Sequence, residues 1–176
     1  MSLPLVRSEF TDKTEPAWMR PTVERLLASL PEGYCQGLGV IVLTRTEISN
    51  NRPRSRRSRA KRRGIRLGSY HPGWNGEAAW IELVVDEIVK ELPKGLTWIQ
   101  PFRDLVVGRV LFHEIGHHLD ATNRSVGRTG EHGAIAWEKR LSRRYFQQRY
   151  SYLRPFAPVL AAAGRFAKMI AARRRT

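Results

Sequence analysis

Apolar residues recur along the chain in patterns that predict short strands and helices. Helical spacing, with apolar side chains three and four positions apart, marks residues 21–30. Runs that are rich in β-branched residues and bounded by turn formers mark strands at 39–43, 65–70 and 78–85. The first half of the chain is therefore expected to form one helix and about three strands.

The second half of the chain shows mainly helical periodicity. Pro101 opens a helix in which apolar residues recur as far as Leu119. Further helices are predicted at residues 131–150 and 158–174, the last of them amphipathic with a basic face. Strands followed by helices predict an α+β fold, in which a small mixed or antiparallel sheet packs on the Pro101 helix and on the helix after it.

A length of 176 residues suits one domain. Residues 1–20 begin with a polar stretch that contains prolines and shows no periodicity, so we expect an N-terminal arm that is either flexible or laid across the domain as a strap. We assign residues 21–154 to a single domain. Residues 155–176 are expected to form the basic amphipathic helix at the C-terminus.

Positive charge is concentrated in one segment. The chain has 31 Lys and Arg residues against 16 Asp and Glu, a formal net charge of +15. Residues 52–66 contain nine basic residues and no acidic one, within a predicted basic loop at 50–66. Such a run can bind phosphates through counterion release, but without interleaved aromatic residues it does not indicate specific recognition. A solvated loop and a weak nonspecific nucleic-acid contact both remain open.

Cysteine content and the apolar runs indicate the compartment. Cys35 is the single cysteine and cannot form an internal disulfide, which is typical of a reducing cytoplasm. The N-terminus lacks a signal-peptide pattern, and no apolar run reaches the roughly 18 to 20 residues that span a bilayer. We expect a cytoplasmic protein without a transmembrane segment.

The Pro101 helix contains the pattern His-Glu-x-x-His at residues 113–117. His113 and His117 are four positions apart and therefore lie on one face of the helix, where both imidazoles can reach one Zn²⁺ at about 2.0 to 2.1 Å. Glu114 can take a proton from the water on the metal, as a general base for amide hydrolysis. A solvent-facing helix is the competing explanation, but the apolar residues upstream of the motif predict burial, where unpaired imidazoles are costly.

The motif and the strand at 78–85 before it resemble the zincin metallopeptidases over about residues 35–150. Metzincins continue with a glycine and a third histidine, whereas Asp120 and Asn123 occupy those positions here. The chain is more similar to the gluzincins, in particular to the short minigluzincins. That resemblance implies a zincin-like fold, a third zinc ligand that is a glutamate on the following helix, and a peptide substrate that pairs with the 78–85 strand.

Two glutamates compete for the third ligand position. Glu138 lies on an otherwise apolar face of the 131–150 helix, where a buried carboxylate needs a partner such as a metal, and it is the favoured candidate. Glu131 lies at the expected start of that helix, where it would also complement the helix dipole. His132 is a third alternative.

Other polar residues near the motif have less certain roles. Asp120 could orient a ligand imidazole or simply end the helix. His118 points about 100° away from the two motif histidines, so we expect a surface or capping residue. His132, Tyr145 and Tyr150 are candidate donors for transition-state stabilisation, and the sequence does not choose among them.

The sequence thus predicts a zinc-dependent metallopeptidase that acts on peptides or unfolded protein segments. Its predicted zinc ligands are His113, His117 and Glu138, and its predicted general base is Glu114. The rival prediction is a basic nucleic-acid-binding or regulatory protein whose zinc site is structural or vestigial, with residues 52–66 as its contact surface.

Overall fold

The computed structural model describes residues 3–10, 15–45, 66–93, 95–122 and 130–152. The chain divides into two units, residues 1–143 and residues 144–176. The predicted helix at 158–174 and nearly all of the predicted basic loop lie outside the described residues. In the described part of the chain, no helix is both long enough and apolar enough to cross a membrane.

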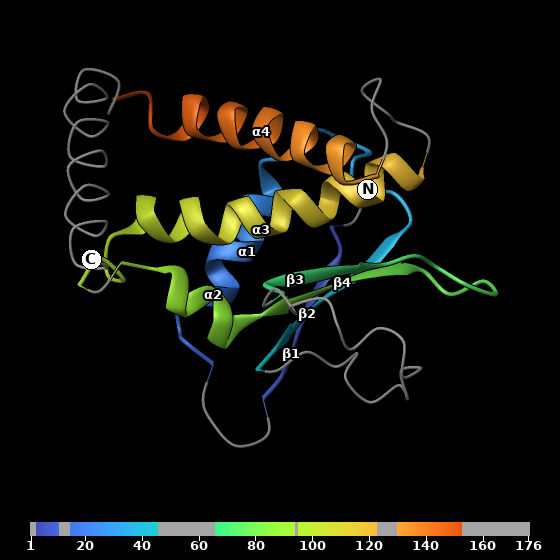
Figure 1. The fold of residues 1–176 in the computed structure, drawn as a ribbon, viewed down its shortest axis with the longest axis horizontal. Helices are drawn as coiled ribbons and strands as arrows, with labels where there is room; N and C mark the ends of the chain where they lie inside the picture. Colours follow the sequence, from blue (N-terminus) through green and yellow to red (C-terminus); the bar gives the residue numbers. More distant parts are fainter. Residues whose placement is uncertain (1–2, 11–14, 46–65, 94, 123–129, 153–176) are drawn as a thin grey trace, which may run out of the picture. The chain divides into compact units, whose positions relative to one another are not determined.

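Four strands form one mixed sheet in the order β1-β2-β4-β3 (Figure 1). Strands β1 (Leu5–Glu9), β2 (Leu38–Thr44) and β4 (Ala79–Val84) run parallel to one another. Strand β3 (Gly68–His71) runs antiparallel to β4 and forms one edge of the sheet. The predicted α+β class and the mixed sheet are confirmed.

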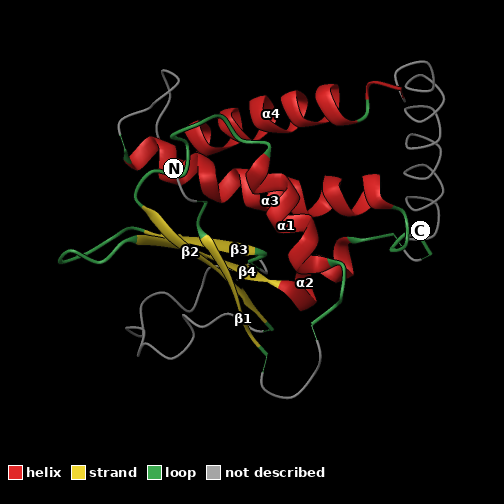
Figure 2. Ribbon diagram, turned by 180° about the vertical axis from the view of Figure 1, so that it is seen from behind, coloured by secondary structure: helices red, strands yellow, loops and turns green. Residues whose placement is uncertain are grey.

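Four helices complete the described fold: α1 (Met19–Ala28), α2 (Val85–Glu91), α3 (Gln100–Ala121) and α4 (Gly130–Arg149). Figures 1 and 2 show α1 and α3 on the same face of the sheet. Helix α3 contacts β3 and β4, and α1 contacts α3 and β1. The helix that carries the motif, α3, therefore packs against both the sheet and α1.

The core lies between α3 and the sheet. Alternate residues of a strand share a face, so Ile41 and Leu43 of β2 lie beside Ile81 and Leu83 of β4, their partners in register. All four side chains have no exposed surface. Helix α3, which contacts β4, contributes three further apolar side chains that are fully buried: Val107, Leu111 and Ile115. This packing fixes the rotation of α3 about its own axis, and therefore the face of α3 that points away from the sheet.

An ion pair joins α1 to α3 inside this layer. The Arg25 guanidinium donates to both carboxylate oxygens of Asp104, at 2.5 and 3.3 Å. The Asp104 side chain is fully buried, whereas 23% of the Arg25 side chain is exposed. A buried carboxylate is tolerated only with such a partner, so this pair fixes the position of α1 on the motif helix.

Two features of the regular structure were not predicted. Residues 5–9, within the expected N-terminal arm, form strand β1; only Val6 of this short edge strand is buried, so its sequence shows almost no apolar alternation. The strand predicted at 78–85 ends at Val84, and the chain turns directly into α2, which was not predicted. Asp86 and Glu87 in the first turn of α2 complement its dipole.

Candidate metal centre

Helix α3 presents the two motif histidines together. The helix has 22 residues and begins at Gln100, with the predicted Pro101 in its first turn. Its apolar face is buried against the sheet. The rings of His113 and His117 have centroids 4.9 Å apart and are nearly perpendicular. About a quarter of each side chain is exposed. Both imidazoles therefore lie at the wall of a cleft, where an ion can reach them.

Glu131, in the first turn of α4, faces both histidines. Its carboxylate oxygens lie 3.5 Å from His113 Nε2 and 3.7 Å from His117 Nε2. Donor atoms of the three side chains all lie within 4.8 Å of one another. Atoms that are each ~2.1 Å from one tetrahedral ion are roughly 3.4 Å apart, so these residues fit a zinc ion with small side-chain adjustments.

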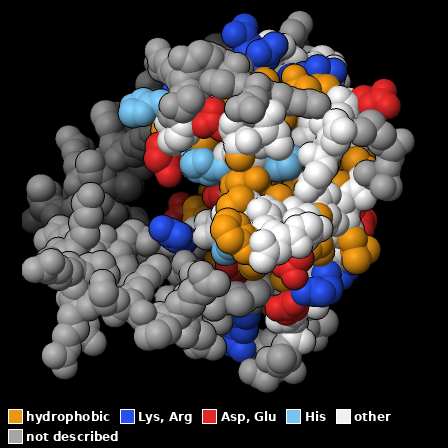
Figure 3. Space-filling model, turned by 90° about the vertical axis from the view of Figure 1, so that its right-hand side faces the viewer, with side chains coloured by type: hydrophobic (Ala, Val, Ile, Leu, Met, Phe, Trp, Pro, Cys, Tyr) orange, Lys and Arg blue, Asp and Glu red, His pale blue; other side chains and the backbone are white. Residues whose placement is uncertain are grey.

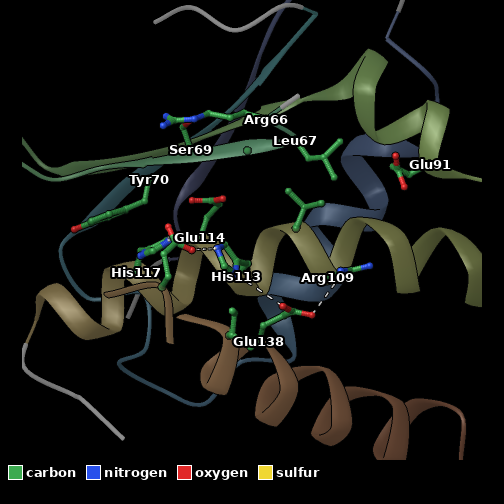
Figure 4. A pocket seen from close by; sticks show the side chains of 14 residues that line it. Arg66, Leu67, Ser69, Tyr70, Glu91, Arg109, His113, Glu114, His117 and Glu138 are labelled. Carbon is green, nitrogen blue, oxygen red and sulfur yellow. Dashed lines mark ion pairs between the residues drawn. The ribbon is translucent and has the colours of Figure 1, made fainter. Parts of the chain in front are cut away.

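Glu138 faces the other nitrogen of the same histidine. One oxygen lies 3.8 Å from His113 Nδ1 and the other lies 3.7 Å from Arg109 Nε (Figure 4). The side chain of Glu138 is 18% exposed, against 74% for Glu131. The structure thus brings both candidate carboxylates to His113, with only Glu131 facing the Nε2 atoms of both motif histidines.

Glu114 lines the same cleft and lies between the motif helix and the edge strand β3. It is 7% exposed, and its carboxylate accepts a hydrogen bond from the backbone N–H of Tyr70. Burial raises the pKa of Glu114 from 4.5 to about 7, more than the Tyr70 N–H and the charge of Arg66 lower it. A carboxyl group with a pKa near neutrality is suited to accept and return a proton.

The imidazole of His117 is kept neutral. Burial lowers its pKa below the ordinary value of 6.5, and the neighbouring His113 lowers it further. Only the neutral ring has a lone pair for a metal. The environment of His117 therefore favours the form that a metal ion requires.

Two glycines allow these groups to come close together. A Cβ on Gly68 of β3 would lie 3.0 Å from Glu114 Cγ and 2.9 Å from a methyl carbon of Val110. A Cβ on Gly116 would lie 2.8 Å from the Cα and carbonyl oxygen of Ala134 in α4. Neither glycine was predicted from the sequence to matter for the site. Glycine inside a strand or helix weakens it, so each position was a sequence signal of close backbone approach.

The edge of the sheet beside the cleft is β3, not the strand at 78–85. Strand β4 pairs with β2 on one side and β3 on the other, so the expectation that it binds a peptide by main-chain pairing is wrong. Val84 N–H donates to the Leu67 carbonyl at 2.9 Å. Antiparallel pairing alternates, so the backbone groups of Gly68 and Tyr70 point away from β4. One of these groups is the Tyr70 N–H, which donates a hydrogen bond to the Glu114 carboxylate.

These residues line one cleft of about 670 Å³, between the β3 edge and helices α3 and α4. On the face shown in Figure 3, histidine and acidic side chains gather around a hollow. Arg66, Arg109, Ile135 and Glu91 complete much of its wall. The cleft therefore combines a candidate metal site, a candidate base and, among the described residues, the outer edge of the sheet at β3.

Several other predicted site residues lie elsewhere. His118 is 2% exposed, not on the surface as expected: its Nε2 contacts the Gln36 carbonyl oxygen at 3.0 Å, and its Nδ1 lies 3.4 Å from the Tyr70 hydroxyl. Asp120 accepts a hydrogen bond of 2.6 Å from Gly130 N–H. This bond connects the end of α3 to the start of α4, so Asp120 helps to place Glu131.

The candidate donors for transition-state stabilisation are not among the residues that line the cleft. His132 is exposed at the start of α4. Tyr145 and Tyr150 are buried, belong to the second unit and contact each other edge to face. Their proposed role stays a prediction.

Comparison with protein-family models, with curated proteins and with solved structures finds no match to this chain.

Proposed function

We propose that this protein is a zinc-dependent metallopeptidase in which His113, His117 and Glu131 hold the metal and Glu114 is the general base. The observation that carries the proposal is the arrangement of Glu131 opposite both Nε2 atoms, at 3.5 and 3.7 Å, with a buried carboxyl group beside them. Two imidazoles and one carboxylate are a typical catalytic zinc set, because they leave a fourth position open.

The proposed third ligand differs from the one favoured by the sequence. Glu138 was favoured because a charged residue on an apolar helix face needs a partner, and it does have partners, Arg109 and His113 Nδ1. What supports Glu131 is its position opposite both Nε2 atoms. Its exposure is compatible with this role, because a catalytic metal site opens to the cleft.

The chemistry divides between the ion and the chain. Bound zinc supplies a Lewis acid that activates water and polarises the scissile carbonyl. Glu114 accepts the proton of the attacking water and returns it to the amine that leaves. Its raised pKa, about 7, places both transfers within reach at neutral pH. The hydrogen bond from Tyr70 N–H holds the Glu114 carboxylate beside the edge strand before the proton transfer.

Extended peptides are the substrate class that fits this cleft. An exposed strand edge recognises a peptide by main-chain hydrogen bonds, which do not depend on the peptide's side chains. Along the cleft wall, the backbone groups of Gly68 and the Tyr70 carbonyl can form such bonds, while the Tyr70 N–H donates to Glu114. A folded protein has no free strand to add, so the proposed substrates are peptides or unfolded protein segments.

Metal analysis and peptide cleavage together test the proposal. The wild-type protein, purified without chelators, should contain one zinc per chain and cleave an unstructured fluorogenic peptide mixture. Glu114→Gln should keep its zinc and lose about 10² or more in kcat. Glu24→Gln is the matched control, because it makes the same change at an exposed carboxylate outside the cleft. Wild-type protein that contains no zinc, or Glu114→Gln that cleaves normally, would contradict the proposal.

The same experiments separate the peptidase from the rival function. A nucleic-acid-binding protein with a structural zinc site would hold zinc, show no cleavage and be retained on DNA in a salt-dependent way. Deleting residues 52–65, outside the described part of the chain, would then abolish retention. The peptidase proposal instead expects cleavage that depends on zinc and Glu114.

A further inference from the structure

We infer that Glu138 is a positioning residue, which orients the His113 ring through Nδ1 and is itself held by Arg109. The inference rests on the proposed zinc site and deepens it. It assigns a role to a carboxylate that is not needed as a ligand once Glu131 faces both Nε2 atoms.

The three side chains form a line across the α3–α4 interface. Arg109 and His113 lie one turn apart on α3, and the Glu138 carboxylate from α4 lies between them (Figure 4). The two oxygens are divided, one toward Arg109 Nε at 3.7 Å and one toward His113 Nδ1 at 3.8 Å. These are ion-pair distances, and a small rotation of either side chain brings Nδ1–H to hydrogen-bond distance.

The chemistry of imidazole explains why this position matters. A neutral ring that gives the lone pair of Nε2 to a metal carries its proton on Nδ1, and that N–H needs an acceptor. A carboxylate acceptor fixes the tautomer and the ring orientation and makes the coordinating nitrogen more basic. Glu138 is the carboxylate that faces Nδ1 of His113, so it meets this requirement.

Arg109 stabilises the Glu138 carboxylate in this position. Glu138 is 18% exposed, and a carboxylate so far removed from water is costly unless a cation or donor accompanies it. Most of the Arg109 side chain is in solvent, at 78% exposure. The arginine can therefore compensate the charge of Glu138 while its own guanidinium keeps most of its hydration.

A ligand role and a positioning role make different predictions for metal binding. Removing a residue that orients a ligand weakens metal affinity by about 10- to 100-fold, while all ligands remain. Removing a ligand changes the coordination itself. Among the described residues, the donor atoms that gather within 4.8 Å of one another belong to His113, His117 and Glu131, without Glu138.

The experiment measures zinc affinity by chelator competition and the absorption spectrum of the Co²⁺-substituted protein. Glu138→Ala should bind zinc about 10- to 100-fold more weakly, yet reach one zinc per chain at saturation and keep the wild-type Co²⁺ band positions. Glu138→Gln should lose less affinity, because its amide oxygen still accepts from Nδ1–H. Glu91→Ala is the matched control: it removes a carboxylate from the cleft wall and should leave the affinity unchanged.

A double substitution tests the Arg109 part of the inference. Arg109→Ala should weaken zinc binding in the wild-type background and have no further effect in Glu138→Ala, because it acts through that carboxylate. Thermal unfolding of the metal-free variants checks that they fold, and Glu138→Gln serves as the test if Glu138→Ala does not.

Three outcomes would overturn the inference. Unchanged zinc affinity in Glu138→Ala would leave Glu138 without a role toward the metal. Shifted Co²⁺ bands with loss of stoichiometric zinc would make Glu138 a ligand, as the sequence first suggested. Wild-type protein that binds no zinc would overturn this inference and the proposed function together. Zinc binding without peptide cleavage would instead contradict only the peptidase proposal, and the affinity series would still decide the role of Glu138.

Discussion

Gly116 of the motif helix lies directly against Ala134 of α4, with so little space that a Cβ on Gly116 would be 2.8 Å from the Ala134 backbone. It is the second variable position of the His-Glu-x-x-His pattern. Glu131 is three residues before Ala134, so the close approach of the two backbones at this point sets how far the Glu131 carboxylate is from the histidines.

Gly116→Ala should therefore weaken the metal site although alanine is the better helix former by about 1 kcal/mol. The added methyl group must push α4 away, which should cost about 1 to 3 kcal/mol of unfolding free energy and reduce zinc affinity. Urea denaturation and chelator competition measure the two effects. Gly108→Ala in the same helix is the control, since its Cβ would meet side-chain atoms, of Leu26 at 3.3 Å and of Phe112 at 3.6 Å, and not the backbone of another helix.

Gly68→Ala should reduce catalysis more than metal binding. Its Cβ would lie 3.0 Å from Glu114 Cγ, so the general base must move while the histidines stay. Misplacing a catalytic group by about 1 Å can cost ~10² in rate, and we expect a loss of kcat of that order at full zinc content. Ser69→Ala on the next residue, whose side chain faces the other side of the sheet, should be much milder. Equal losses in both variants would contradict this role for Gly68.

Asp104→Ala should destabilise the fold without touching the cleft. The variant leaves the Arg25 guanidinium without its buried carboxylate, although Arg25 is partly exposed and also contacts the Thr22 hydroxyl. We expect a loss of ~3 kcal/mol in urea denaturation, at the lower end for removing one partner of a buried pair. Glu24→Ala, an exposed carboxylate on α1, should stay within about 0.5 kcal/mol of wild type.

The stability of the metal-free protein should depend on pH through Glu114. Its pKa is about 7 in the folded state and 4.5 as an ordinary side chain, so between these values the folded protein binds more protons than the unfolded chain. The free energy of unfolding therefore falls as pH rises from about 4.5 to 7. Thermal unfolding of chelator-treated wild type and Glu114→Gln measures the difference. Glu114→Gln should gain stability relative to wild type across this window, and parallel curves would contradict the assignment.

Local patterns in the sequence predicted the helices and strands whose formation depends mainly on residues close together in the chain. The motif helix begins within one residue of its expected start, and β2 extends the expected strand 39–43 by one residue at each end. The pairing of β1 with β2 could not be predicted, because it joins residues more than 30 positions apart and buries one side chain of β1. Helical periodicity likewise identified Glu138 as facing inward without showing which nitrogen it meets.

The candidate site divides in the same way. Spacing alone placed His113 and His117 on one face, and the structure brings them together. Which glutamate faces Nε2 depends on how α4 crosses α3, and that is set by the contact of Gly116 with Ala134. The edge strand beside the cleft depends on strand order, which places β4 inside the sheet. Neither property is local in the sequence.

Strand β1 also bears on how the chain can be shortened for experiments. Residues 1–20 were expected to form an N-terminal arm, yet residues 5–9 pair with β2 from Val40 to Thr44. Without them, β2 would become an edge strand whose unpaired backbone groups flank Ile41 and Leu43. Exposed apolar edges of this kind associate with other chains. A truncated protein starting near residue 21 is therefore expected to aggregate, even though the proposed metal site lies beside the opposite edge of the sheet.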